Sequence, residues 1–434
     1  MMTQGYSSFA RNVYIVDGAR TPFLKSKNVP GVFSASDLAV QAGRELLARH
    51  SFSTNIIDEV VVGCVMPGVE EANIGRVIAL RLGCNKTMPA WTVQRNCASG
   101  MQALDSAAKD IACGRHHLVL AGGTEAMSRA PLLYSNAMTV WIAGLMQARG
   151  YQDKLKQYAR FRPYFLKPVI ALLKGLTDPI VNLSMGQTAE NLAFQFGITR
   201  EEMDQFALAS HQRVAAAQDE QHLKEVTTIF GTKSDFYVSD DGVRRDSSMQ
   251  KLAQLKPFFD KKFGSVTAGN SSQVSDGAAM LLLASEEAVQ KYQLPVLACI
   301  RDVEWSGVDP AVMGLGPVHA THHLLKRHGL TLDQIDYWEI NEAFAAQVLA
   351  CLSAFESDEY CKEKLGEPHA LGVINRDRLN VDGGAVALGH PVGASGARIV
   401  LHLANVLQRQ KAKLGIATIC IGGGQGGAML IEKV

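Results

Sequence analysis

Two similar segments, one in each half of the chain, constrain the fold more than any other feature. In the first, Cys-Ala-Ser-Gly at 97–100 precedes a helix-compatible stretch and a strand that ends in two glycines, at 117–123. In the second, Gly-Ala-Ser-Gly at 393–396 precedes a similar stretch and an apolar strand that ends in three glycines, at 415–424. Both segments predict a tight turn, a helix, a strand and a glycine turn. We interpret the pair as an internal duplication of one α/β unit.

The N-terminal region predicts alternating strands and helices. A short strand at 12–16 is expected to enter a polar turn at 17–22, and apolar residues recur at helical spacing in 37–50. The β-branched segment 57–65 is typical of a buried strand. This alternation predicts an α/β fold with mostly parallel strands. A chain of 434 residues is also long enough for two or three domains.

Composition excludes several classes of protein. Forty-three basic residues against 42 acidic ones leave no charge excess for nucleic-acid binding. The eight cysteines form no C-x-x-C pair and no disulfide-like framework, which favours a reducing compartment. No run of about 18 apolar residues occurs, and the start of the chain shows no signal-peptide pattern, so we expect a cytoplasmic protein.

Residues 134–179 differ from the rest of the chain and read as an insertion. Apolar residues flank a net charge of +5, from seven basic and two acidic side chains. One interpretation is a lid or subdomain that covers part of the core, as most amphipathic helices pack on their own protein. The other is a surface that meets a membrane or a partner protein. We expect the first of these.

Cys97 is the first candidate for chemistry. It precedes a helix of small residues, at 101–113, and the positive end of a helix dipole lowers a thiol pKa and favours the thiolate. Small neighbours would let an extended ligand approach the sulfur. Taken alone, a cysteine beside glycine is more often a small apolar filler.

Three further candidates lie in the second half. His390 follows a glycine-rich turn and precedes a proline, where it could act as a base or donate to an oxyanion, or simply be a satisfied histidine. Cys420 closes an apolar strand before a glycine turn whose N–H groups could bind an anion. Asn341 follows a strand at 335–340, where its amide could hold a water or donate to a developing negative charge.

Together these segments resemble a known family. In order and spacing, four blocks are similar to the active-site blocks of the thiolases: 96–100, 341–344, 389–396 and 420–424. Residues 266–278 resemble the family's coenzyme A-side loop, and residues 20–23 its N-terminal signature. The resemblance covers nearly the whole chain.

The resemblance implies a fold. We expect two duplicated α/β halves that form a five-layer αβαβα core with an inserted loop domain. The N-terminal half would comprise 1–133 and 266–292, and the C-terminal half 293–434. The basic insertion, 134–185, would lie within a loop domain that extends to about residue 265.

The resemblance also implies roles for individual residues. Cys97 would form the acyl-enzyme, His390 would activate it and help stabilise the enolate, and Cys420 would exchange a proton with the acetyl α-carbon. Asn341 would hold a water in one oxyanion hole, and the N–H groups of Cys97 and Gly422 would form the other. The expected substrate-binding residues are Ser272 and Met185, the latter in the acyl pocket.

Related classes are disfavoured by the same residues. Ketoacyl synthases typically pair their cysteine with two histidines, and a lipid-transfer-like relative would not need all of these groups. No permanent cofactor and no metal site are expected, because His319, His322 and His323 have helical spacing without a complete ligand set. Coenzyme A would be a substrate.

The choice within the family depends on two extra stretches. Residues 134–179 and 358–378 resemble those of the thiolase subunit of fatty-acid β-oxidation complexes, in which the enlarged loop contacts a membrane or partner subunit. We therefore expect a 3-ketoacyl-CoA thiolase that releases acetyl-CoA and a shortened acyl-CoA, as a homodimer or a dimer of dimers. The alternatives are a short-chain acetoacetyl-CoA thiolase and a non-catalytic acyl-CoA-binding or scaffolding protein.

Overall fold

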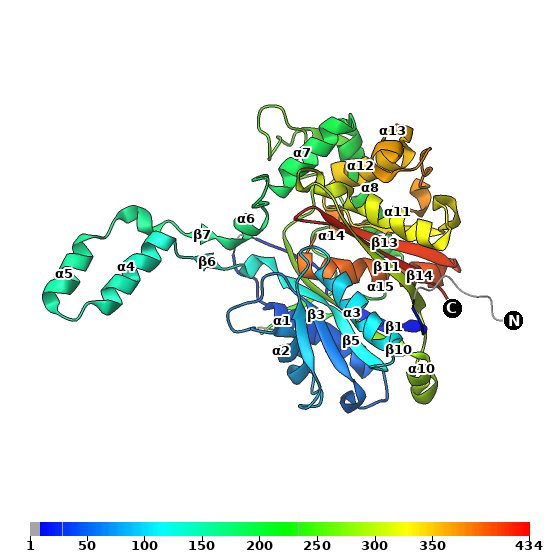
Figure 1. The fold of residues 1–434 in the computed structure, drawn as a ribbon, viewed down its shortest axis with the longest axis horizontal. Coiled ribbons are helices and arrows are strands. Elements are labelled where there is room, and N and C mark those ends of the chain that lie inside the picture. Colours follow the sequence, from blue (N-terminus) through cyan, green and yellow to red (C-terminus); the bar gives the residue numbers. More distant parts are fainter. Residues whose placement is uncertain (1–8, 28, 233) are drawn as a thin grey trace.

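A ten-stranded mixed sheet runs through the centre of the molecule (Figure 1). The computed structural model describes residues 9–27, 29–232 and 234–434. The strand order is β12-β13-β14-β11-β1-β10-β5-β3-β4, and β2 pairs with β10. The strands are β1 (Val13–Arg20), β2 (Leu24–Lys25), β3 (Glu59–Gly63), β4 (Ala90–Val93), β5 (Leu118–Ala126), β10 (Ser275–Ser285), β11 (Ala298–Gly307), β12 (Tyr337–Ile340), β13 (Leu414–Ile421) and β14 (Gln425–Glu432).

Helices cover both outer faces of this sheet. Others lie between the strands of the N-terminal half and those of the C-terminal half. In the first half they are α1 (Ala35–Ala48), α2 (Ile74–Arg81), α3 (Ser99–Ala112) and α10 (Glu286–Tyr292). The loop region holds α4 (Asn136–Gln147), α5 (Tyr151–Ala159), α6 (Ala171–Gly175), α7 (Met185–Gln195), α8 (Arg200–Asp219) and α9 (Met249–Ala253). The second half contributes α11 (Gly316–His328), α12 (Ala345–Glu356), α13 (Asp358–Tyr360), α14 (Ala385–Leu388) and α15 (Val392–Gln410).

The molecule has five layers. Helices α3 and α15 lie side by side in the middle layer, where their apolar residues form one cluster with strands from both halves. Helices α1 and α2 cover the outer face of the first half, and α11 and α12 cover that of the second. The expected arrangement of two duplicated halves in an αβαβα core is confirmed.

The contact between the two central helices is reciprocal, which explains the repeated glycines. A Cβ on Gly100 would lie 2.9 Å from the backbone nitrogen of Ala397, and one on Gly396 would lie 2.7 Å from that of Met101. Each helix therefore needs glycine where the other passes. The equivalent helices of the duplicated units approach each other closely, and this brings their N-terminal ends together.

Three expectations about strands and turns are wrong, at least in part. Among the described strands only β3–β4, β3–β5 and β12–β13 pair in parallel, because a tight turn at 422–424 folds β14 back on β13 and β10 lies antiparallel to β5. Gly122 and Gly123 lie inside β5 and not in a turn. A Cβ on Gly123 would lie 2.0 Å from the carbonyl oxygen of Gly393, so α15 requires glycine there. The turn expected at 17–22 is in part strand, since β1 continues through a register shift to Arg20.

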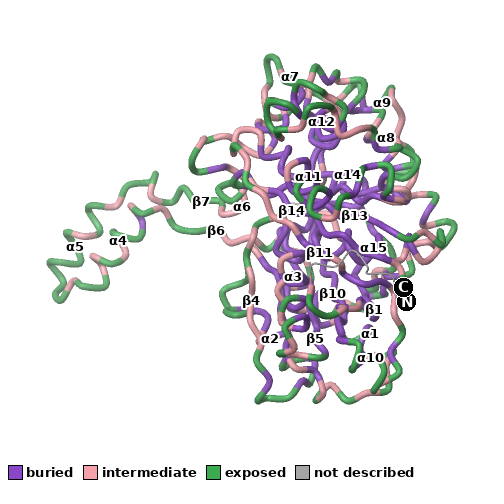
Figure 2. The backbone as a smooth tube through the Cα atoms, turned by 45° about the vertical axis from the view of Figure 1, so that its right-hand side comes forward, coloured by how far each residue is buried: buried purple, intermediate pink, exposed green. Residues whose placement is uncertain are grey.

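The basic insertion projects away from the core and does not cover it, which contradicts the preferred expectation (Figure 1). Short strands β6 (Leu132–Leu133) and β7 (Val169–Ile170) form its neck, and α4 and α5 pack on each other beyond them. We call residues 134–168 the α4–α5 hairpin. Trp141 of α4 contacts Phe161 at a ring distance of 5.1 Å, so the hairpin has its own small aromatic cluster. Most of its surface is exposed or half-buried (Figure 2).

The remaining loop region packs on the core through buried ion pairs. Arg20 of β1 binds Asp240 at 2.6 Å, and His402 of α15 binds Glu225 at 2.8 Å and Asp382 at 3.1 Å. These carboxylates raise the pKa of His402 to about 10 against the opposing effect of burial. Strands β8 (Ile229–Phe230) and β9 (Phe236–Tyr237) form a small ribbon in the same region.

Within the described residues, none of the helices combines the length and apolar character needed to cross a bilayer. The proposed domain boundaries stay a prediction. The first of them begins with residues 1–8, which lie outside the described part of the chain.

Candidate active site

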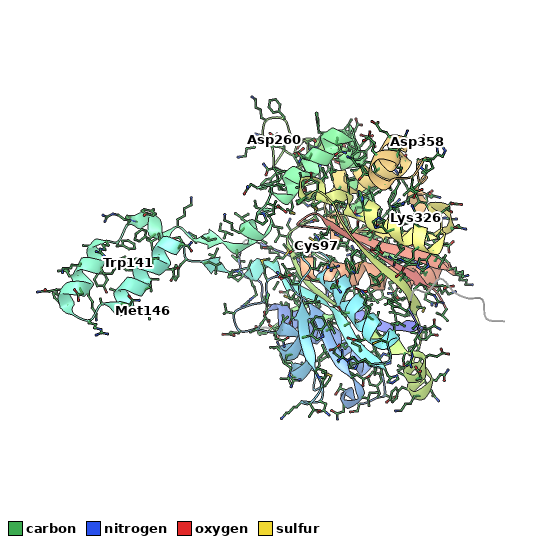
Figure 3. The ribbon with its side chains drawn as sticks, viewed as in Figure 1. Cys97, Trp141, Met146, Asp260, Lys326 and Asp358 are labelled. Atoms are coloured by element: carbon green, nitrogen blue, oxygen red, sulfur yellow. The ribbon has the colours of Figure 1, made fainter. Side chains whose placement is uncertain are left out.

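Cys97 lies between β4 and α3, in the body of the molecule and away from the hairpin residues Trp141 and Met146 (Figure 3). Asn96, just before it, has a left-handed backbone with φ of 42°. Asparagine tolerates this conformation better than most residues, so it can turn the chain sharply between strand and helix. The turn places the cysteine at the N-terminal end of α3.

Two backbone N–H groups act on the thiol pKa of Cys97, those of Gly422 and of Cys97 itself. Both lower the thiol pKa, yet burial has the larger effect and the pKa is raised overall. The expectation of a thiol pKa lowered by the helix is therefore wrong for the free site. Cys97 is held mainly as a thiol and needs a base to become a nucleophile.

The glycine turn after β13 forms the other wall of the site. Asn96 donates its side-chain N–H to the carbonyl oxygen of Gly422 at 2.7 Å. Gly423 and Gly424 have φ of 92° and 77°, a backbone that a side chain would strain. The turn thus joins the Cys97 segment of one half to the C-terminal strands of the other.

Cys420, the next-to-last residue of β13, is buried close enough to Cys97 for their charges to interact. Burial and the negative charge that Cys97 would carry both raise the pKa of Cys420 far above its ordinary value. Cys420 therefore holds its proton while Cys97 reacts. A thiol in this state can donate a proton to a carbanion formed beside it.

The two expected substrate-binding residues occupy different places. Met185, the first residue of α7, has its sulfur 3.3 Å from the position that a Cβ on Gly422 would occupy, so it lies against the glycine turn. Ser272 is half-buried, and its N–H donates to the carbonyl oxygen of Ala343 at 3.0 Å. It lies beside the Asn341 segment.

His390 reaches the site from the turn before α15. Its N–H donates to the carbonyl oxygen of Gln273 at 3.1 Å, and its Nδ1 lies 2.7 Å from the hydroxyl of Ser395. That hydroxyl also lies 3.1 Å from the carbonyl oxygen of Pro391, which can only accept, so we assign the hydroxyl proton to Pro391 and the ring proton to Nδ1. The Nε2 atom then carries a lone pair, and it is buried with no hydrogen-bond partner among the described residues.

The imidazole of His390 is neutral. Burial and the positive charge of Arg398 lower its pKa to about 3. Nε2 therefore carries a free lone pair, and with a pKa this low it is a weak base in the free enzyme. The close approach of Gly393 to Gly100, three residues from each of His390 and Cys97, brings the two segments together.

Asn341 is fully buried at the end of β12, and its N–H donates to Thr418 of β13 at 2.9 Å. Its amide oxygen accepts a hydrogen bond from Arg398 at 3.4 Å. Its Nδ2 has no partner in the part of the chain that the structure describes. An unpaired buried donor is costly, so this N–H group is available to a water or a substrate oxygen.

Glu125 is a residue at the site that the sequence did not reveal. This buried carboxylate at the end of β5 accepts N–H groups from Val65, Met66 and Gly393 at 2.9, 3.0 and 3.1 Å. Burial raises its pKa to about 7. It ties the loop after β3 to the start of α15, close enough to Cys97 to raise the pKa of the thiol.

Arg398 and Glu339 were also missed, and they form a buried ion pair at 2.9 Å. Each interrupts an apolar pattern, Arg398 in a helix and Glu339 in a strand. A charged residue at a position that periodicity assigns to the core was the available signal, since such charges are almost always paired.

The histidines of α11 have structural partners. His319 binds the hydroxyl of Tyr360 at 2.9 Å, and His322 binds Glu367 at 2.8 Å, so the segment 358–378 packs on this helix. Elsewhere, the side-chain atoms of Glu59, Asp110 and His116 that could bind a metal ion lie within 4.8 Å of one another. This group lies beside the C-terminal end of α3, at the opposite end of the helix from Cys97.

Two family models match the chain, the thiolase N-terminal domain at residues 13–287 and the thiolase C-terminal domain at residues 294–433. The chain belongs to the thiolase family. Among curated relatives, a 3-ketoacyl-CoA thiolase of Yersinia pestis (strain Pestoides F) is 38% identical over 423 residues, which is 97% of this chain and 96% of the relative.

Solved structures agree with this family. The human mitochondrial 3-ketoacyl-CoA thiolase in complex with CoA matches with a TM-score of 0.84 and 35% identity, over 99% of this chain and 100% of that one. An acetyl-CoA acetyltransferase from Syntrophomonas wolfei matches with a TM-score of 0.85 and 33% identity, over 98% and 99%. The predicted thiolase fold and the predicted enzyme class, an acyltransferase, are confirmed.

Proposed function

We propose that this thiolase is a 3-ketoacyl-CoA thiolase, which cleaves a 3-ketoacyl-CoA with coenzyme A into acetyl-CoA and a shortened acyl-CoA. The observation that carries the proposal is the meeting of the two halves at Cys97, where Asn96 binds the carbonyl oxygen of Gly422 at 2.7 Å and where Nε2 of His390 and Nδ2 of Asn341 are buried without a partner among the described residues. The curated relatives at 38% identity are named 3-ketoacyl-CoA thiolases, and a similar solved enzyme is in complex with CoA.

In the first half-reaction, Nε2 of His390 takes the proton of Cys97, and the thiolate attacks the 3-keto carbon. The adduct collapses with cleavage of the C2–C3 bond, which leaves an acyl thioester on Cys97 and the enolate of acetyl-CoA. Cys420 protonates that enolate at carbon, and the amide of Asn341, through a water, together with His390, stabilises the enolate oxygen.

In the second half-reaction, the thiol of coenzyme A loses its proton to Cys420 and attacks the thioester. The negative oxygen of this tetrahedral intermediate is held by the N–H groups of Cys97 and Gly422, both of which lower the thiol pKa in the free enzyme. Collapse of the intermediate breaks the bond to Cys97. The released thiolate recovers its proton from His390.

The test is the acyl-enzyme itself. Incubation with 3-ketoacyl-CoA, without free coenzyme A, should add the mass of one shortened acyl group to the protein, and Cys97→Ala should abolish this adduct. Cys113→Ala removes an exposed cysteine and is the matched control, so it should retain the adduct. An adduct on the Cys97 variant would overturn the assignment of the nucleophile. Binding of acyl-CoA without an adduct or turnover would favour the non-catalytic alternative.

A short-chain acetoacetyl-CoA thiolase is the second candidate. Two similar solved structures are acetyl-CoA acetyltransferases, from Bacillus anthracis at 36% identity and from Syntrophomonas wolfei at 33%. A chain-length series of 3-ketoacyl-CoA substrates separates the candidates. We expect kcat/KM to rise beyond the four-carbon substrate. A maximum at four carbons would favour the short-chain activity.

We further propose that the α4–α5 hairpin binds an anionic membrane surface. Val140, Met146 and Leu155 are 71%, 83% and 58% exposed beside the hairpin's basic side chains. Apolar residues mixed with lysine and arginine on projecting helices are typical of segments that lie on a membrane. The alternative is that the hairpin binds a partner subunit of a β-oxidation complex.

The assembly and the compartment are also proposals. We propose a homodimer or a dimer of dimers; β4 is the last strand in the sheet order, so a second copy could pair with its outer edge. All eight cysteines are free, which fits a reducing compartment such as the cytoplasm. Light scattering coupled to size exclusion would measure the assembly.

A further inference from the structure

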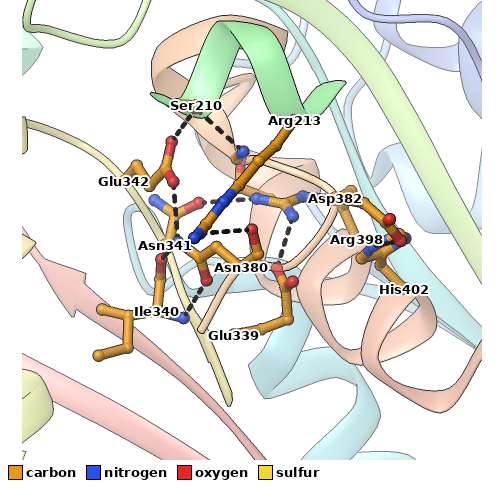
Figure 4. A network of polar contacts seen from close by, with 12 residues as sticks. Ser210, Arg213, Glu339, Ile340, Asn341, Glu342, Asn380, Asp382, Arg398 and His402 are labelled. Carbon is orange, nitrogen blue, oxygen red and sulfur yellow. Dashed lines mark hydrogen bonds and ion pairs between the residues drawn. The ribbon is translucent and has the colours of Figure 1, made fainter. Parts of the chain in front are cut away.

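Arg398 is a charged residue in the middle layer of the fold. It lies on α15, is 2% exposed, and donates to Glu339 at 2.9 Å and to the amide oxygen of Asn341 at 3.4 Å (Figure 4). The other charged groups that act on it are Arg20, Glu342 and Glu225. Its guanidinium therefore connects the Asn341 segment of β12 with the helix that follows His390.

The contact with Asn341 decides which way the amide points. A guanidinium has five donors and no acceptor, so it can only pair with the amide oxygen. The NH₂ group must then point the other way. It is buried and has no partner in the described chain, as a group reserved for a ligand would be.

Arg398 also acts on His390. Its positive charge adds to burial in lowering the pKa of the imidazole, which becomes about 3. The pKa of His390 therefore reports the charge of Arg398, while the direct contact with Asn341 leaves the amide N–H free to donate to a developing negative oxygen.

We propose that Arg398 is a positioning residue for the thiolase reaction, which aims the amide N–H of Asn341 into the site. It acts through Asn341 and not by touching the substrate. The inference rests on the proposed function, since it assumes that Asn341 serves the reaction.

The test must remove the charge of Arg398 without leaving Glu339 buried and unpaired. We compare the double variant Glu339→Gln/Arg398→Met with Glu339→Gln alone, which keeps the guanidinium. The double variant should lose about 100-fold in kcat with little change in KM, the size of effect seen when one oxyanion donor is lost. Glu339→Gln should keep most of the activity.

A second readout is independent of turnover. Nitrogen NMR of histidine-labelled protein follows the titration of His390, and its pKa should rise in the double variant and stay low in Glu339→Gln. Arg398→Lys keeps the positive charge but loses the planar set of guanidinium donors that pairs with Asn341. The pKa of His390 should therefore stay low while kcat falls. This variant also serves if the double variant does not fold.

Equal losses of kcat in Glu339→Gln and in the double variant, with the pKa of His390 unchanged in both, would reduce Arg398 to a structural ion pair and overturn the proposal. Absence of an acyl adduct on the wild-type protein would instead contradict the proposed function. The titration of His390 would still decide whether Arg398 controls the imidazole.

Discussion

The side chain of Asn96 and the carbonyl oxygen of Gly422 are joined by a hydrogen bond of 2.7 Å, 326 positions apart in the chain. This bond holds the turn after β13 against the turn before α3. Because the N–H of Gly422 lowers the thiol pKa of Cys97, the same bond sets the position of a group that acts on the thiol. A contact between the two halves therefore shapes the chemistry.

Replacing Asn96 should weaken catalysis more than binding. Asn96→Ala loses the bond to Gly422 and also strains a residue with φ of 42°. Loss of one hydrogen bond to a buried group costs about 1–3 kcal/mol, and the part of it that is lost only in the transition state sets the fall in kcat, at most roughly 150-fold. Asn96→Gly is the matched control, since it loses the bond without the strain. Full activity in Asn96→Gly would show that the bond is not needed.

Alkylation of Cys97 should be slow at neutral pH. Burial raises the pKa of this thiol above its ordinary 9.0, so the reactive thiolate accumulates only above that pH. The rate of iodoacetamide labelling, followed by mass spectrometry of the Cys97 peptide, should keep rising beyond pH 9. A plateau below pH 8 would mean that the N–H groups around the sulfur outweigh burial.

Glu125 should make stability fall as the pH rises. Its pKa is raised from 4.5 to about 7 in the folded protein, so its contribution is fully present below pH 4.5 and is lost as pH rises through 7. Relative to Glu125→Gln, the wild-type free energy of unfolding should fall by up to about 3 kcal/mol across that window. Urea unfolding of both proteins from pH 4.5 to 8 measures the difference. A constant difference would contradict the raised pKa.

His402 should stabilise the protein over a different range. Its pKa is raised from 6.5 to about 10 by Glu225 and Asp382, so its contribution is fully present below pH 6.5 and is lost as pH rises through 10. Breaking such a buried pair with His402→Gln should cost about 3–5 kcal/mol at pH 6 and less at pH 10. Denaturation at the two pH values tests this, and an equal loss at both would argue against a charged imidazole.

Removal of the α4–α5 hairpin should separate membrane binding from catalysis. Leu133 pairs with Val169 across the neck, so an Asn-Gly turn can join them directly in place of residues 134–168. The shortened protein should lose sedimentation with phosphatidylserine vesicles, since each basic residue contributes about 1 kcal/mol near such a surface. Turnover of acetoacetyl-CoA should be retained.

Two outcomes would count against the membrane proposal. The first is that the intact protein, tested in parallel, does not sediment with phosphatidylserine vesicles and a second protein copurifies through the hairpin. That result would favour the partner subunit. Equal sedimentation with neutral phosphatidylcholine vesicles would show that the basic side chains contribute nothing.

Much of the site could be predicted because its residues lie in short, recognisable segments. Cys97 before a small-residue helix, His390 after a glycine turn and Cys420 at a strand end are local patterns. So is the duplication, since helical and strand periodicities depend only on neighbouring residues. Local patterns in the sequence therefore determined the duplicated α/β units and the candidates for chemistry, while the five-layer arrangement was implied by the resemblance to the thiolases.

Tertiary structure decided what depends on distance and burial. The direction of the strands followed from how β10 and β14 return to the sheet, and the place of the hairpin from its lack of contacts with the core. The thiol pKa of Cys97 is raised and not lowered, because burial outweighs two local N–H groups. Arg398 acquired a role only when α15 brought it beside Asn341, since the energy of a charge depends on the groups that surround it in space.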